Sequence, residues 1–392
     1  MFPVKISGIG VVSALGIGVN ANLEALQSGR SGLGAISLFD TNHCVPVGEV
    51  KCSNDELRQR LGLPIDKVFS RTAMLGMMAA REALDDAQID THWRVGLVSA
   101  TSVGGMDLTE QFYRDFMRNP DGGRLRMVVH HDSADSTLHI ADYCGIDHFS
   151  TTISTACSSS ANAIMLGARL IRAGLLDVVV AGGTDALCQF TVNGFASLKI
   201  LDTQPCRPFD ATRAGLNLGE GAGYIVLQRA DAPSVRDYGR LLGFANANDA
   251  THQTATSQSG DGAFLSMSKA LQMAELSTAA IDYINVHGTG TGNNDASEGA
   301  ALQRIFGADI PTFSSTKAFT GHTLAAAGGI EAVFSLLAMR HGAVWPNLNF
   351  TTPMRELPLV PETHFRDGLA IHHVMSNSFG FGGNCATLIF GK

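Results

Sequence analysis

Hydrophobic positions gather in short runs rich in Val, Ile, Ala and Gly, and these runs alternate with longer segments in which apolar residues recur at helical spacing. Strands are predicted over residues 4–12, 94–102, 176–186, 222–230, 240–248 and 282–291, and helices over residues 20–29, 69–88 and 264–277. Alternation of buried strands with helices is typical of an α/β protein.

A weak internal repeat divides the chain. Residues 151–171 and residues 312–339 each predict a strand, a turn of small hydroxyl residues and an apolar helix. The expected halves, residues 1–234 and 235–392, would each open with a strand that contains glycine or alanine. If the halves are related, the two helix starts can face each other and form one site between them. Ordinary similarity among α/β segments is the alternative explanation.

Composition and charge exclude several classes of protein. Of the 392 residues, 45% are hydrophobic and 16% are charged, which favours a large buried core over disorder. The net charge is -8 and no basic cluster occurs, so nucleic-acid binding is not expected. The first twenty residues contain several glycines and predict a strand and its turn rather than a signal peptide. No segment is long enough for a transmembrane helix, and we expect a soluble, cytoplasmic protein that does not bind membranes.

The cysteine and histidine spacing predicts neither disulfides nor a metal site. Seven cysteines are scattered without a C-x-x-C motif, which is typical of reduced thiols. The histidine pairs at residues 130–131 and 372–373 lack companion ligands at metal spacing, so no metal is expected.

One cysteine, Cys157, occupies a position that suits chemistry. Residues 148–155 are rich in β-branched residues and predict a strand, and the serines at 158–160 suit the first turn of the apolar helix that follows. A thiol at this junction lies at the positive end of the helix dipole, which stabilises a thiolate. A small buried packing residue is the alternative, and the local sequence leaves both interpretations open.

Three further segments carry candidate chemistry. His287 follows an apolar strand and enters a Gly-Thr loop. Lys317 and His322 flank a second Gly-Thr turn, and Glu331 lies in the apolar helix beyond it. A buried Lys and a buried Glu are rarely left unpaired, so an ion pair beside His322 is expected. Phe381 lies among glycines that allow the backbone to approach a substrate closely.

Four motifs occur in order: TACSSS around Cys157, HGTGT from His287, KAFTGH ending at His322, and NSFGFGG around Phe381. Together they resemble the signatures of the β-ketoacyl-acyl carrier protein synthases of the thiolase superfamily, and the resemblance covers essentially the whole chain. It implies a thiolase-like fold of two related halves with α-β-α-β-α layers. It also implies decarboxylative condensation of malonyl-acyl carrier protein with an acyl chain, which elongates a fatty acid or a polyketide such as a polyene.

The resemblance assigns roles residue by residue. Cys157 resembles the nucleophile that holds the acyl chain as a thioester, and its backbone N–H with that of Phe381 resembles the oxyanion hole. His287 and His322 resemble the pair that supports decarboxylation, with Lys317 and Glu331 supporting the site. The remaining positions are expected at the periphery of the site: Thr289 and Thr291 for the phosphopantetheine arm, Phe381 as a gate, Val103 and Phe195 as walls of the acyl pocket, and Lys67 and Lys199 for docking of the carrier protein.

The same resemblance implies an acyl carrier protein as partner and no cofactor beyond the phosphopantetheine that carries the substrates. The family is dimeric, so we expect a homodimer or a heterodimer with a related ketosynthase-like subunit. A non-catalytic subunit that sets chain length is the main alternative, although such relatives usually lack the nucleophile. A degradative thiolase would carry a second cysteine before its glycines, and a starter-unit synthase would more often have Asn at position 322. The segment GGNCA departs from the Thr-Asn pair of many relatives, and Cys385 has no assigned role.

Overall fold

The computed structural model describes residues 3–89 and 92–392. Within these ranges, eleven strands form one mixed sheet. They are β1 (Val4–Ser13), β2 (Gly16–Ile17), β5 (Val95–Ala100), β6 (Phe149–Ile153), β7 (Val178–Asp185), β8 (Gly221–Arg229), β9 (Arg240–Asn248), β10 (Tyr283–Asn285), β11 (Thr312–Ser314), β12 (His373–Phe379) and β13 (Asn384–Gly391). A separate short pair consists of β3 (Leu33–Gly34) and β4 (Val47–Gly48).

The main strands repeat one order. The first five run β1-β8-β7-β5-β6 across the sheet, and the second five run β9-β13-β12-β10-β11. In each set the three outer strands are parallel, and the two inner strands are antiparallel to their neighbours. The two sets meet where Lys5 of β1 pairs with Arg240 of β9. The expected division after residue 234 falls between β8 and β9, and it stays a prediction as a domain boundary.

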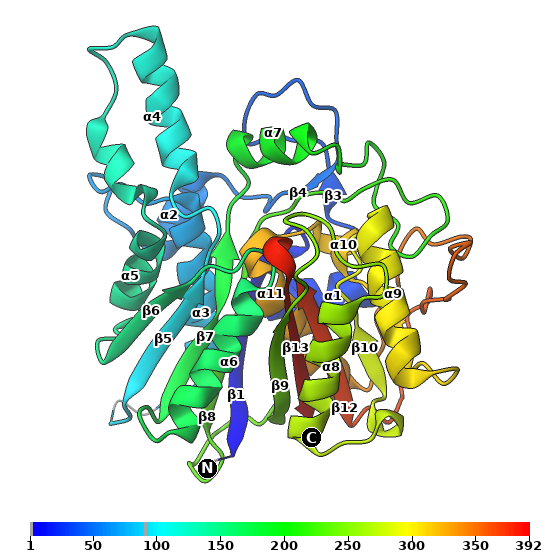
Figure 1. Cartoon of the computed structure of the whole chain (residues 1–392). Helices are drawn as coiled ribbons and strands as arrows, with labels where there is room; N and C mark the ends of the chain where they lie inside the picture. The colour runs from blue at the N-terminus through cyan, green and yellow to red at the C-terminus, as the bar shows by residue number, and fades with distance from the viewer. Residues whose placement is uncertain (1–2, 90–91) are drawn as a thin grey trace.

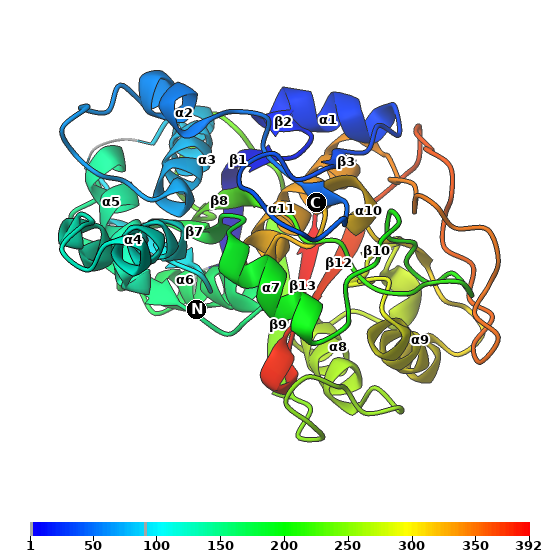
Figure 2. The same cartoon turned by 90° about the horizontal axis from the view of Figure 1, so that it is seen from above.

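Helices cover both outer faces and fill the space between the two sets of strands (Figures 1 and 2). The central pair, α6 (Ser159–Arg172) and α11 (Ala327–His341), contacts strands of both sets and packs together. On the outer faces, α3 (Arg71–Ala87) and α5 (Ser133–Cys144) cover the first set, while α8 (Asp261–Ala274) covers the second and packs on α9 (Gly292–Phe306). These layers confirm the expected thiolase-like α/β fold.

The remaining helices lie around this frame. They are α1 (Val19–Gln27), α2 (Asn54–Leu61), α4 (Met106–Arg118), α7 (Gln189–Ser197) and α10 (Lys317–Thr320), with the 3-10 turns η1 (Leu125–His131), η2 (Thr278–Ala280), η3 (Leu324–Ala326) and η4 (Phe381–Gly383). In Figure 1, α4 projects from the body of the molecule.

Close packing explains the small residues of β1. A Cβ added to Gly10 would lie 2.0 Å from the carbonyl oxygen of Ala79 on α3, and one added to Gly8 would lie 2.2 Å from that of Ala83. Glycine is therefore required for the helix to approach the strand. None of the helices in the described ranges is long and apolar enough to cross a membrane.

Candidate active site

The predicted catalytic side chains come from loops that follow the carboxyl ends of four strands. Cys157 follows β6, His287 follows β10, Lys317 follows β11 and Phe381 follows β12. A cavity of about 220 Å³ lies among these loops and brings together Cys157, His287, His322 and Phe381. The structure thus places side chains from both halves of the chain in one site.

A strained turn holds Cys157 in place. Ala156, the residue before it, has a φ of 53°, in the left-handed region that residues other than glycine rarely adopt. The hydroxyl of Ser159 stabilises this turn by accepting from the Thr155 N–H at 2.7 Å and donating to the Ala156 carbonyl. Helix α6 then begins at Ser159, as the sequence predicts. The thiol of Cys157 is 7% exposed and lines the cavity.

Burial controls the protonation of this thiol. It raises the pKa of Cys157 to about 12, while the charge of Lys317 and the N–H of Phe381 act in the opposite direction. Burial therefore favours the protonated thiol over the thiolate. Burial thus opposes the thiolate that is expected at the start of α6, and that thiolate stays a prediction.

The two histidines are neutral and present the same face to the cavity. Burial, followed by the charge of Lys317, lowers the pKa of both rings well below the usual value. Lys317 Nζ donates to Nδ1 of His287 at 3.2 Å, and the Leu324 N–H donates to Nδ1 of His322 at 3.1 Å. Because each Nδ1 accepts a hydrogen bond, each Nε2 carries the proton. The ring centroids lie 5.3 Å apart with the planes at 86°, and both rings line the cavity.

Lys317 and Glu331 form the predicted buried ion pair. Lys317 Nζ lies 2.5 Å from a carboxylate oxygen of Glu331, and the side chains are 2% and 4% exposed. The same ammonium donates to the carbonyl oxygen of His287 at 2.6 Å. Its three protons are thus directed to the Glu331 carboxylate, to Nδ1 of His287 and to the carbonyl oxygen of His287. These contacts fix the position and the tautomer of the His287 ring.

Two buried carboxylates that the sequence analysis missed also hold the site. Glu298 of α9 accepts from the N–H groups of His287 and Gly288 at 2.9 and 2.8 Å. Burial raises the pKa of Glu298 to about 7. Asp185 at the end of β7 accepts from the N–H groups of Val103 and Ala325 at 3.1 and 2.8 Å. Glu298 closes the segment that begins at His287, and this proximity in sequence was the available signal.

The departure at GGNCA has a structural explanation. The side-chain oxygen of Asn384 accepts from Ser158 at 2.6 Å, from Asn162 at 2.9 Å and from Asn246 at 2.7 Å, and so joins β13 and β9 to the start of α6. Cys385 is buried on the opposite side of the strand, where a Cβ added to Gly262 of α8 would lie 2.9 Å from its sulfur. Cys385 is a packing residue between β13 and α8.

Aromatic and hydroxyl residues form the rest of the cavity. Phe195 and Phe381 stack with ring centroids 5.8 Å apart. The hydroxyls of Thr289 and Thr291 lie 3.0 Å apart on another part of the lining. Gly380 packs on the nucleophile loop, since a Cβ there would lie 3.1 Å from the Cys157 nitrogen. The backbone just before Phe381 therefore lies against the Cys157 backbone, and the oxyanion-hole role of the two N–H groups stays a prediction.

The structure separates the other predicted positions. Lys199 is exposed and lines the cavity. Lys67 is also exposed, but it lies beside His139 and not at the cavity. Val103 is buried in the hydrophobic cluster against which Phe195 packs, outside the cavity lining. The pocket-wall and docking roles of these residues stay predictions.

One inference about metal ligands is wrong. The sequence analysis found no companion ligand for His130, yet ligand atoms of His130, Asp135 and His139 lie within 4.8 Å of one another. Asp135 and His139 are four residues apart on α5, so they share one face of the helix.

Comparisons with known proteins agree with the fold and with the motifs. The β-ketoacyl synthase N-terminal domain family matches residues 1–232, and the C-terminal domain family matches residues 238–351. The chain is 32% identical to the 3-oxoacyl-[acyl-carrier-protein] synthase 2 of Staphylococcus aureus (strain COL), with 99% of this chain and 98% of the relative covered.

Two solved structures are similar over the full chain. The ishigamide ketosynthase/chain length factor has a TM-score of 0.92 at 29% identity, covering 100% of this chain and 99% of the other. The ketosynthase ApeO in complex with its chain length factor ApeC, from Xenorhabdus doucetiae, has a TM-score of 0.83 at 32% identity, covering 100% and 98%. The resemblance seen in the four motifs is confirmed: the chain belongs to the β-ketoacyl synthase family.

Proposed function

We propose that this protein catalyses the decarboxylative Claisen condensation of malonyl-acyl carrier protein with an acyl chain held on Cys157, and so elongates a fatty acid or a polyketide. The observation that carries the proposal is the shared cavity of the Cys157 thiol and two neutral imidazoles, His287 and His322, that both present Nε2–H. A thiol suits acyl transfer, and paired neutral donors suit an enolate.

In the first step, the Cys157 sulfur attacks the thioester carbonyl of an acyl-acyl carrier protein. The Cys157 and Phe381 N–H groups hold the tetrahedral oxyanion. The C–S bond to the pantetheine sulfur then breaks, and this sulfur takes the proton that leaves Cys157. Because the same number of thiols exists before and after, the step needs no permanent thiolate in the resting protein.

In the second step, malonyl-acyl carrier protein occupies the emptied cavity. The bond between the malonyl methylene carbon and its carboxylate breaks, and CO₂ leaves. The electron pair moves to the thioester oxygen, where the Nε2–H groups of His287 and His322 donate to the developing enolate. Neutral donors serve here without losing a proton, and Lys317 keeps His287 in the required tautomer.

In the third step, the enolate carbon attacks the acyl group on Cys157. The two backbone N–H groups hold the second oxyanion, and its collapse expels the Cys157 sulfur, which takes a proton from solvent water. The product is a β-ketoacyl chain on the carrier protein, two carbons longer than the acyl chain. The reaction makes and breaks C–C and C–S bonds without a redox change, so the substrates need only their phosphopantetheine carriers.

The surroundings of the cavity suit such carriers. Hydroxyls of Thr289 and Thr291 supply donors and acceptors for the amides of a phosphopantetheine arm. Lys199 at the lining offers a positive charge to an acidic carrier protein, with Lys67 as a second, more distant candidate. Phe195, Phe381 and Val103 are proposed for the acyl pocket.

The expected assembly is a dimer, either of two copies or with a related subunit. Two similar structures, those named above for ishigamide and for Xenorhabdus doucetiae, contain a chain length factor, which supports the second arrangement. A silent chain-length subunit is the less supported role for this chain, because Cys157 and both histidines are present and share a cavity. The cytoplasmic location stays a prediction.

The proposal is tested by separating the two half-reactions. Cys157→Ala should abolish β-ketoacyl formation from acyl- and malonyl-acyl carrier protein, yet should still release CO₂ from malonyl-acyl carrier protein, because His287 and His322 remain. Product mass and released CO₂ are the measurements. The proposal is refuted if Cys157→Ala still forms the β-ketoacyl product. It is also refuted if the purified wild-type protein neither binds acyl groups nor releases CO₂ with any partner subunit.

A further inference from the structure

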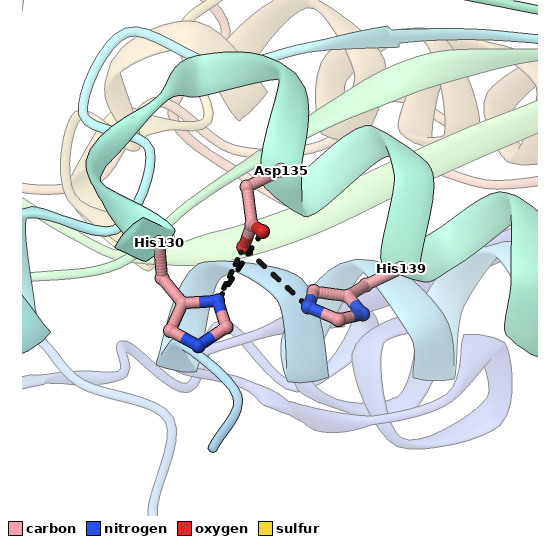
Figure 3. A group of neighbouring side chains, drawn as sticks. All are labelled: His130, Asp135 and His139. Atoms are coloured by element: carbon pink, nitrogen blue, oxygen red, sulfur yellow. Dashed lines mark hydrogen bonds and ion pairs between the residues drawn. The ribbon is translucent and has the colours of Figure 1, made fainter. Parts of the chain in front are cut away.

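A group of potential metal ligands lies outside the catalytic cavity. His130 comes from η1, and Asp135 and His139 come from α5, on the outer side of the first half (Figure 3). Nδ1 of His130 lies 3.1 Å from Oδ2 of Asp135, and Nε2 of His139 lies 3.5 Å from the same oxygen. None of the three residues lines the cavity that contains Cys157.

The spacing of these atoms suits a small tetrahedral cation. Bonds of about 2.0–2.1 Å to Zn²⁺ place neighbouring ligand atoms about 3.3 Å apart, which lies between the two measured distances. The third distance, between the two imidazole nitrogens, is at most 4.8 Å, so a modest ring rotation completes the set. The rings already lie only 34° from parallel, with centroids 5.7 Å apart.

The nitrogen of His139 supplies independent support. Its Nε2 is buried and makes no hydrogen bond within the described part of the chain, although it faces the Asp135 carboxylate. A buried imidazole nitrogen that makes no hydrogen bond is costly, and a metal bond would satisfy it. The side chains of His130, Asp135 and His139 are 17%, 19% and 27% exposed, so the group lies near the surface.

We propose that His130 Nδ1, the Asp135 carboxylate and His139 Nε2 bind one Zn²⁺ ion, with water as the fourth ligand. Two imidazoles and one carboxylate are a ligand set that Zn²⁺ accepts. On binding, His130 takes the neutral tautomer that carries its proton on Nε2, so the lone pair of Nδ1 binds the metal. The charge of Asp142 raises the pKa of His139 and that of Lys67 lowers it. The two charges therefore also have opposing effects on a bound cation.

The bound ion would fasten η1 to α5. The carbonyl of His130 packs against Gly105, where an added Cβ would lie only 1.8 Å from its oxygen. Gly105 immediately precedes α4, the projecting helix whose exposed residues include Tyr113 and Met117. The site therefore anchors the base of the projection that α4 and η1 form, away from the reacting atoms.

The test uses full-length protein freed of metal and titrated with Zn²⁺, with Co²⁺ absorption bands as a probe of coordination. Exposed Cys44 is replaced by Ser throughout, because a thiol also binds Zn²⁺. We expect one ion per chain and a higher Tm with Zn²⁺. Asp135→Asn and His139→Gln should each weaken binding at least about 100-fold, because even loss of an outer partner costs 10–100-fold.

His131→Gln is the matched control, because His131 is adjacent to the site but hydrogen-bonds to Thr109. It should bind Zn²⁺ like the parent. The proposal is overturned if the parent does not bind Zn²⁺, or if Asp135→Asn and His139→Gln bind it as tightly as His131→Gln. Circular dichroism of each variant shows whether a loss of binding comes from unfolding. Failure of the protein to bind Zn²⁺ would not affect the proposed condensation reaction.

Discussion

At the scale of single residues, the site depends on protonation states that burial imposes. The motifs identified Cys157, both histidines and the Lys317–Glu331 pair, because each residue type suits one step of the reaction. They could not show how deeply Cys157 is buried, since burial depends on chain segments far away in sequence, and burial raises the pKa of its thiol. They also could not reveal Leu324, whose N–H fixes the tautomer of His322.

The state of Cys157 predicts how its reactivity depends on pH. Burial raises its pKa to about 12, so the thiolate fraction should grow about tenfold per pH unit below that value. Alkylation of Cys157 by iodoacetamide, followed by peptide mass spectrometry, should therefore rise continuously from pH 7 to pH 10. Exposed Cys44 serves as the control in the same digest. A plateau for Cys157 between pH 7 and 8 would indicate a stabilised thiolate instead.

The paired imidazoles predict non-additive losses. His287→Ala and His322→Ala should each slow CO₂ release about 10²–10³-fold, the usual cost of removing one donor to an oxyanion. The double variant should lose less than the product of the two, because both donors act on one charge. Acyl transfer to Cys157 should be affected less. Normal CO₂ release by His322→Ala would show that this ring plays no part in decarboxylation.

At the scale of elements, the site is built by turns at strand ends. Most main strands and the two apolar helices that begin beside Cys157 and after His322 were predicted from the sequence pattern, whereas β12 and β13 were not. The cluster of His130 with Asp135 and His139 could not, because η1 and α5 have mixed polar sequences and only their packing brings the ligands together. Glu298 was missed because its partners are backbone N–H groups, and its proximity to His287 in sequence was the only signal of its role.

The turn η4 predicts a gate at the cavity. Phe381 stacks on Phe195, and Gly382 after it has a φ of 82°, which glycine adopts without strain. We expect the ring to close the acyl pocket while Cys157 is free and to move when the chain enters. Phe381→Ala should increase decarboxylation of malonyl-acyl carrier protein without prior acylation, relative to condensation.

Structures with free and acylated Cys157 give the direct view of this gate. A changed Phe381 side chain or backbone is the expected difference. An identical conformation in both states would show that Phe381 is a fixed part of the wall.

At the scale of the whole molecule, the binding of an acidic carrier protein is opposed by the negative net charge of this protein. The net charge is -8, so an acidic carrier protein needs local positive charge. Lys67 and Lys199 were equal candidates for carrier-protein docking on sequence grounds. Of the two, the structure places only Lys199 at the cavity.

We therefore expect Lys199→Glu to weaken carrier-protein affinity more than Lys67→Glu, with a lower salt dependence in the double variant. Affinity measured at several salt concentrations tests this. Lys269→Glu, which changes an exposed lysine on α8, is the control and should change little. A salt dependence that stays the same in the double variant would place the docking surface elsewhere.

Mass measurement of the acyl chain on Cys157 tests the proposed mechanism most directly. The protein is incubated with acyl-acyl carrier protein, and the mass of each cysteine-containing peptide is measured before and after malonyl-acyl carrier protein is added. The proposed mechanism predicts the acyl mass on the Cys157 peptide alone, followed by its loss as CO₂ and a carrier-bound β-ketoacyl chain two carbons longer appear. An acyl group on another cysteine, or a Cys157 thioester that malonyl-acyl carrier protein does not discharge, would contradict it.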